Sequence, residues 1–127
     1  MATGLENFRI YHLAEKLEIL VFNVTKEFPN DEKYRSVDQL RRSSSATTNN
    51  IVEGYSRYTY KEKIRYFIIA RAEAEETKRG ILRSIKKDFL SQELSSKISE
   101  EYTILIKSIN KYIRFLKTKI HPTQSPN

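Results

Sequence analysis

Basic and aromatic side chains are concentrated in one ten-residue stretch of the chain, residues 57–66. Lysine and arginine can neutralise phosphate groups, and tyrosine rings can stack on unpaired bases. The stretch therefore predicts a surface that binds RNA or DNA with little sequence preference and a strong dependence on salt. An alternative interpretation has the tyrosines packing at helix ends while the lysines stay solvated. The residues expected to make the contact are Arg57, Tyr58, Tyr60, Lys61, Lys63 and Arg65.

Further positive charge lies on both sides of this stretch. Lys33, Tyr34 and Arg35 are expected to add to the surface from the preceding loop, and the region from Arg79 to Lys87 continues the charge. The 127-residue chain has 23 basic and 16 acidic residues, a net charge of +7. A balance this basic favours an anionic partner over a merely well-solvated protein.

A second set of polar residues lies in and near the segment QLRRSSSATTNNIVEGYSR, residues 39–57. At 100° per residue, its amide, acid and guanidinium groups lie about 120° around a helix from the apolar side at Leu40 and Ile51. This stripe either binds a ligand or packs against another part of the protein. We favour a structural polar network or a subunit interface, made by Arg42, Asn50, Glu53 and Glu76.

The motifs of several enzyme classes are missing. The sequence has no glycine-rich phosphate loop, no HExxH, no nucleophile elbow and no cysteine, and its two histidines are far apart. We predict no catalytic residues, no metal and no cofactor. The alternative is a ribonuclease, because Arg114 and His121 have the spacing of the Arg-x(4–6)-His motif of helical HEPN ribonucleases. Against it, Phe115 replaces the usual polar residue and His121 precedes Pro122.

The elements that must position these residues are predicted to be helices. Apolar residues recur at spacings of three and four, and only three glycines and three prolines are present. Capping boxes are expected at Ser36–Gln39 and Thr59–Glu62. Gly54 is expected to end a helix in a left-handed conformation, and Gly80 to mark a bend or a close contact. The predicted helices run from about Ile10 to Glu27, from Ser36 to about Tyr55, from about Tyr60 to a turn at residues 88–91, and from about Gln92 to Lys119.

Four amphipathic helices with short loops predict an all-α, single-domain, antiparallel up-down-up-down bundle over residues 1–120, with a disordered tail at 121–127. The apolar face of the fourth helix is wide, because Ile106, Ile113 and Ile120 form a second row. This width, with that of the first helix, suggests a homo-oligomer. No transmembrane run or signal peptide is evident, so a cytoplasmic location is expected.

Several short motifs together carry a family resemblance. The chain resembles the bacterial four-helix-bundle family first named for proteins encoded in intervening sequences of large-subunit ribosomal RNA genes. The resemblance extends from Phe8 to about Ile120, with departures at Thr47 and at Ala72-Glu73. The motifs are Phe28-Pro29, Glu32, Tyr34, Gln39-Leu40-Arg41-Arg42, Asn50-Ile51-Val52-Glu53-Gly54, Arg57, Ala70-Arg71 and Glu76.

The resemblance implies a homopentamer of four-helix bundles. It also implies kinship with the accessory proteins of diversity-generating retroelements, which are basic and bind a reverse transcriptase and nucleic acid. The function expected is therefore that of a non-enzymatic, basic, oligomeric nucleic-acid-binding or accessory protein. The alternatives are a scaffold that binds only a protein partner and the ribonuclease considered above.

Overall fold

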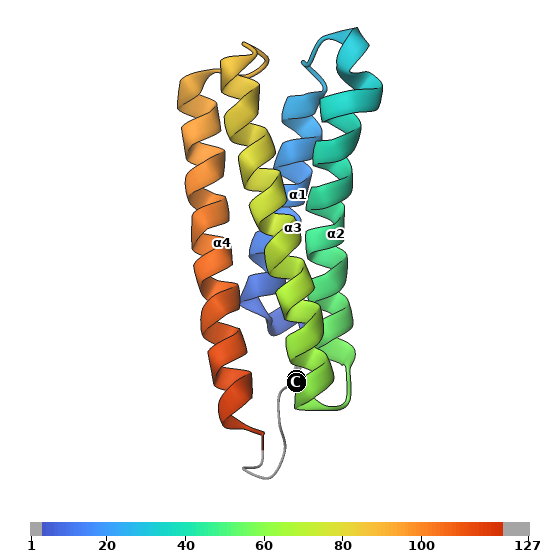
Figure 1. The fold of residues 1–127 in the computed structure, drawn as a ribbon, viewed down its shortest axis with the longest axis vertical. Coiled ribbons are helices and arrows are strands. Elements are labelled where there is room, and N and C mark those ends of the chain that lie inside the picture. Colours follow the sequence, from blue (N-terminus) through green and yellow to red (C-terminus); the bar gives the residue numbers. More distant parts are fainter. Residues whose placement is uncertain (1–3, 121–127) are drawn as a thin grey trace.

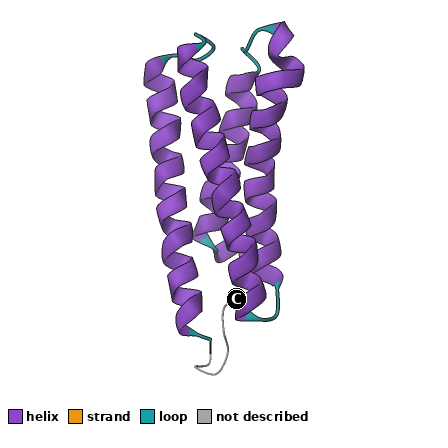
Figure 2. Cartoon of the chain, in the orientation of Figure 1, coloured by secondary structure: helices purple, strands orange, loops and turns teal. Residues whose placement is uncertain are grey.

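The computed structural model describes residues 4–120, which form an antiparallel bundle of four helices. The chain runs up, down, up and down (Figure 1), and no strand occurs in this described part (Figure 2). The predicted fold class is confirmed, while the predicted tail at residues 121–127 lies outside the described residues. The helices are α1 (Arg9–Thr25), α2 (Asp38–Ser56), α3 (Tyr60–Lys86) and α4 (Gln92–Thr118).

The helix ends follow from local sequence chemistry in three of four cases. α1 ends shortly before Phe28 and Pro29, because the residue before a proline is disfavoured in the helical region. Thr59 caps α3, and its Oγ1 accepts a hydrogen bond from the Glu62 N–H at 3.1 Å. Ser91 caps α4 in the same way through the Leu94 N–H at 3.2 Å. Helix bounds therefore agree with the predicted ones to within a few residues.

The start of α2 differs from the prediction. Residues 33–37 form a wide π-helical turn in which Arg35 has non-helical φ and ψ angles of −122° and −105°. Ser36 lies within this turn and donates to Glu32 Oε1 at 2.7 Å, so the predicted capping box at Ser36–Gln39 is wrong. The Ser36 hydroxyl is used as a donor to the buried Glu32 carboxylate, and it accepts no hydrogen bond from a backbone N–H at the start of α2.

Gly54 also has a different role from the predicted one. It lies inside α2 and its φ is negative, so it does not end the helix in a left-handed conformation. Instead, a Cβ at this position would lie 3.0 Å from both Tyr66 Cβ and Phe67 Cε2. The glycine is therefore a point of close approach between α2 and α3.

Small residues bring α2 and α3 together along much of their length. Ser43 and Thr77 share a hydrogen bond of 2.7 Å between their hydroxyl groups, and both side chains are buried. At Gly80, an added Cβ would lie 2.6 Å from Leu40 Cδ2, which confirms the predicted close contact. Hydroxyl and glycine positions on this seam reduce buried apolar area but allow a short interhelical distance.

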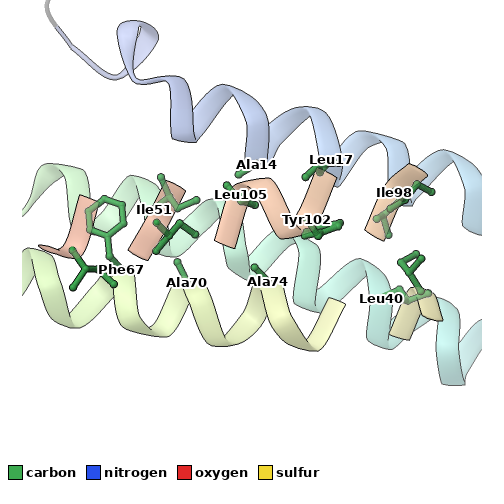
Figure 3. Close-up of a cluster of buried hydrophobic side chains, with 14 of the residues drawn as sticks. Ala14, Leu17, Leu40, Ile51, Phe67, Ala70, Ala74, Ile98, Tyr102 and Leu105 are labelled. Carbon is green, nitrogen blue, oxygen red and sulfur yellow. The ribbon is translucent and has the colours of Figure 1, made fainter. Parts of the chain in front are cut away.

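The core is mainly aliphatic, and all four helices contribute to it (Figure 3). Leu17, Leu40, Ile98 and Leu105 are almost fully buried, and so is Tyr102. The second apolar row of α4 is also used here, because Ile113 is buried and both Ile106 and Ile120 pack against the core. The width of the α4 face is thus explained largely by contacts within one bundle.

An aromatic cluster closes the end of the bundle where α2 meets α3. Phe8 precedes α1 and packs on Tyr55 and Tyr112, with ring centroids 4.8 and 5.0 Å away. Phe67 lies 4.9 Å from Tyr112 and is fully buried. Three helices and the segment before α1 are joined by these rings, so the α2–α3 corner rests on a well-packed base.

Candidate nucleic-acid interface

The connection between α2 and α3 has only three residues, Arg57 to Thr59. It brings most of the predicted nucleic-acid contact residues to one corner of the bundle. The predicted capping box is present in a modified form, because Glu62 Oε2 accepts from the Thr59 hydroxyl at 3.0 Å. The corner is therefore ordered by its own side chains.

Arg57 holds this corner in place. Its guanidinium pairs with Glu53 Oε2 at 3.2 Å and donates to the Tyr66 hydroxyl at 2.9 Å. The guanidinium carbon also lies 4.7 Å from the centre of the Tyr66 ring, which is a cation–π distance. Because the Arg57 guanidinium makes these contacts within the protein, its charge is only partly available to a ligand.

Lys63 has a similar role. Its Nζ donates to the Tyr55 carbonyl at 2.7 Å, near the C-terminal end of α2, where backbone carbonyls lack helical partners. Partial burial lowers the pKa of Lys63. The ammonium group of Lys63 therefore stabilises the end of α2 and is directed at the protein rather than into solvent.

The other four predicted contact residues face solvent. Tyr58 is 96% exposed, which is unusual for a large aromatic side chain, and Tyr60 is 44% exposed. Lys61 and Arg65 are exposed on the first turns of α3. The structure thus divides the predicted surface into two residues that build the corner and four that are free to meet a partner.

The distribution of charge along the bundle is strongly asymmetric. Residues 4–15, 50–72 and 102–120 make up the end that contains the α2–α3 corner, here called the basic half (Figure 1). It has 11 basic and 4 acidic residues, which is the whole net charge of +7. The remaining residues, 16–49 and 73–101, have 12 basic and 12 acidic residues and form the neutral half.

Sequence reasoning missed the contribution of α4 to the basic half. Five basic residues and no acidic residue lie between Tyr102 and Ile120. The antiparallel packing of α3 and α4 places this segment beside the start of α3, as the hydrogen bond of 2.7 Å from Arg71 Nη1 to Asn110 Oδ1 shows. The signal was present in the sequence as an acid-free run, but it became informative only with the topology. The residues are Lys107, Lys111, Arg114, Lys117 and Lys119.

Two groups of predicted basic residues lie elsewhere. Lys33, Tyr34 and Arg35 are at the opposite end of the bundle, so they do not add to the α2–α3 corner as expected (Figure 1). The region from Arg79 to Lys87 also lies in the neutral half. In that half, acidic side chains balance the positive charge.

The polar stripe of α2 makes mainly local contacts. Arg42 pairs with Asp38 at 3.0 Å, Asn50 donates to the Ala46 carbonyl at 2.8 Å, and Glu53 pairs with Arg57. Arg42 and Glu76 line the same groove, of about 580 Å³, between α2 and α3. Within the described chain, these hydrogen bonds do not link the four predicted residues into one buried network.

Other functional hypotheses receive little from the described residues. Arg114 is exposed on α4, and His121 of the ribonuclease alternative lies outside the described residues. Within residues 4–120, no three histidine, cysteine, aspartate or glutamate side chains lie close enough together to hold a metal ion. In the same range, no helix is long and apolar enough to cross a bilayer.

The fold and the charged corner define a class, that of small all-α bundle proteins with one basic end. A model of the 23S rRNA-intervening sequence protein family matches residues 6–111, and the chain belongs to this family. A solved protein of unknown function from the S23 ribosomal protein family of Bacteroides thetaiotaomicron has the same fold. The two are 22% identical with a TM-score of 0.76, over 82% of this chain and 97% of the other. No curated protein sequence matches this chain.

Proposed function

We propose that the protein is a non-enzymatic nucleic-acid-binding protein that uses the α2–α3 corner as a contact surface. The observation that carries this proposal is the confinement of the net charge of +7 to the half that contains the corner. An almost fully exposed tyrosine, Tyr58, lies at the same place. Concentrated positive charge attracts phosphates, and an exposed ring offers a stacking platform for unpaired bases.

The proposal includes assembly into a homo-oligomer, with five subunits as the family resemblance implies. Two basic halves would repel each other, whereas two neutral halves carry no such penalty. Both halves expose apolar side chains, at Ile19, Phe22 and Leu82 in the neutral half and at Ile68, Ile69 and Ile104 in the basic half, so the difference in charge decides between them. We therefore place the subunit contacts in the neutral half. Each subunit then adds its own uncovered basic half to the assembly, and linkage multiplies a modest binding surface.

The family resemblance supports the hypothesis that the protein is an accessory protein of a reverse transcriptase, in the cytoplasm. The basic half suits a protein whose partner handles nucleic acid, because both would then bind the same strand. A purely protein-binding scaffold is the competing outcome. It would bind its partner in nuclease-treated extracts as well as in untreated ones.

The binding experiment compares two double substitutions on the same helix. Lys61→Gln with Arg65→Gln removes two charges from the corner, and Arg79→Gln with Lys86→Gln removes the same charges from the neutral half. Affinity for RNA and DNA is measured at two salt concentrations. If both corner residues contact phosphates, the corner variant should reduce the salt slope by about 1.4 for single strands, and the control should leave it unchanged.

A second comparison isolates stacking. Tyr58→Ala removes the exposed ring of the corner, and Tyr34→Ala removes a ring that is 84% exposed at the opposite end. Loss of single-strand affinity on the first change alone supports the proposal. Equal affinities for the wild type and both variants would show that the corner is only a solvated surface.

Oligomerisation is tested by sedimentation equilibrium at micromolar concentration. Ile19→Ser in the neutral half should weaken the assembly, and Ile68→Ser, at an exposed apolar position in the basic half, should not. A monomer in the wild-type protein would refute this part of the proposal and leave the binding surface as a separate question.

A further inference from the structure

The outer face of α4 in the basic half has two adjoining hollows. One has a volume of about 400 Å³ and the other about 310 Å³, and both are bordered by Ser108 and Lys111. The first is also lined by Ile104, Lys107, Asn110 and Arg114. The second is also lined by Ile10, Tyr112 and Phe115.

The first hollow has the chemistry of a phosphate site. Its lining includes three exposed cations, Lys107, Lys111 and Arg114, and no acidic side chain. At 1.5 Å per residue these cations span about 10 Å along the helix axis. Three cations in a row along one helix can contact successive phosphates of one strand.

Asn110 adds a neutral donor to the first hollow. Arg71 Nη1 donates to Asn110 Oδ1 at 2.7 Å and so fixes the orientation of the amide. The carbonyl oxygen is directed at the guanidinium, and the amide nitrogen remains as a donor for a ligand oxygen. Arg71 contributes a fourth positive charge next to the hollow.

The second hollow is mainly aromatic and apolar. The rings of Tyr112 and Phe115 stack with centroids 5.9 Å apart and planes 30° apart. Phe115 is 50% exposed, and Lys119 Nζ lies 5.0 Å from the centre of its ring. Ile10 of α1 forms part of the opposite wall. An exposed ring with cations beside it can stack on an unpaired base while the cations contact the neighbouring phosphates.

We propose that the two hollows together form a nucleotide subsite for single-stranded nucleic acid. Lys107, Lys111 and Arg114 hold the phosphates in one hollow, and Phe115 stacks with a base in the other. The inference rests on the proposed function and extends it to a second surface, on α4. Because the bases of a duplex are already paired and stacked, only a single strand can fill the aromatic hollow.

The first test uses a short unstructured RNA strand, alone and annealed to its complement, with binding followed by fluorescence anisotropy. Phe115→Ala should weaken binding of the single strand about tenfold and leave duplex binding nearly unchanged. Phe115→Tyr, which keeps a stacking ring, should bind as the wild type does. Circular dichroism and thermal melting check that each variant is folded. Equal losses on both RNAs, or no loss on either, would overturn the inference.

The second test separates this subsite from the α2–α3 corner. Lys107→Gln, Lys111→Gln and Arg114→Gln are combined, with Arg79→Gln, Lys86→Gln and Lys97→Gln as a control that removes equal charge from the neutral half. The α4 variant should lose affinity and salt dependence, and the control should not. If the α4 variant binds as the wild type while the Lys61 and Arg65 variant is weakened, this inference fails and the proposed function stands. The reverse result supports the α4 subsite and removes the corner from the proposed function.

Discussion

The two halves of the bundle are built from the same four helices but differ in charge and in packing. The basic half has a net charge of +7, and its interior contains a cluster of packed aromatic rings. The neutral half has a seam of small and hydroxyl residues and a groove of about 580 Å³, lined by equal numbers of acidic and basic side chains. The charge is therefore separated along the bundle axis, and the basic surface lies at the end that contains the packed aromatic rings.

Removing the central ring of the aromatic cluster should have the largest effect on this contrast. Phe67→Ala deletes a fully buried ring that contacts Phe8 and Tyr112, and it should reduce the free energy of unfolding by about 3–5 kcal/mol. Urea denaturation measures the loss. Ile81→Ala is the comparison in the neutral half, where a smaller side chain is deleted. A greater loss for Ile81→Ala would show that the aromatic cluster is not the better-packed region.

The two helical glycines sharpen the same comparison. Gly54→Ala, in the basic half, should cost about 1–3 kcal/mol because the new methyl meets Tyr66 Cβ, which is attached to the backbone of α3. Gly80→Ala, in the neutral half, should cost less. Its closest contact is the end of the Leu40 side chain, which can rotate away, and alanine favours the helix by about 1 kcal/mol over glycine. Thermal melts of both variants give the order, and the opposite order would contradict this account.

The helices and their packing could largely be predicted from apolar periodicity, since helix length and topology need only spacing and short loops. The start of α2 could not be predicted in this way. The local sequence predicts that Ser36 caps the helix, whereas its hydroxyl donates to the buried Glu32 carboxylate. The role of Gly54 could not be predicted either, since its close contact is with a different helix.

The candidate site was predicted in part. A linear stretch identified the corner residues, including the exposed Tyr58, Tyr60, Lys61 and Arg65. The sequence could not separate these from Arg57 and Lys63, whose polar groups are engaged with other residues of the corner. It also could not bring the cations of α4 to the same end, because that depends on antiparallel packing.

A smaller effect is expected at Tyr102, the residue at which the basic half of α4 begins. Its hydroxyl is fully buried, and no residue of the described chain forms a hydrogen bond with it. A buried polar group without a partner is destabilising, so Tyr102→Phe should leave the free energy of unfolding unchanged or raise it by about 1 kcal/mol. Chemical denaturation at neutral pH checks this prediction, and a clear loss of stability would reveal a partner for the hydroxyl.

The pH dependence of the same variant provides an independent check. Burial raises the pKa of Tyr102 above the ordinary tyrosine value of about 10, with a smaller contribution from Glu18. The unfolded chain therefore releases this proton first, and the folded state loses stability as the pH rises above about 10. Tyr102→Phe should make this decline shallower. Burial also raises the pKa of Tyr112, so some decline should remain.

The smallest expected effect concerns the charges themselves. Replacing Lys107, Lys111 and Arg114 by glutamine relieves repulsion in the basic half. The change should raise the free energy of unfolding by no more than about 0.5 kcal/mol. Removing Arg79, Lys86 and Lys97 from the neutral half should give no gain, since acidic residues balance them. Melting curves at low salt provide the comparison, and equal gains would mean that repulsion is not localised.

The lengthwise separation of charge has a consequence for the kinetics of encounter. α3 is 27 residues long, so it extends about 40 Å, several times the Debye length of about 8 Å at physiological ionic strength. The bundle therefore has a large electric dipole moment, and a nearby polyanion exerts a torque that turns the basic end toward it before contact. The association rate constant should fall steeply with salt, while the dissociation rate constant, which depends on contacts already formed, should respond less.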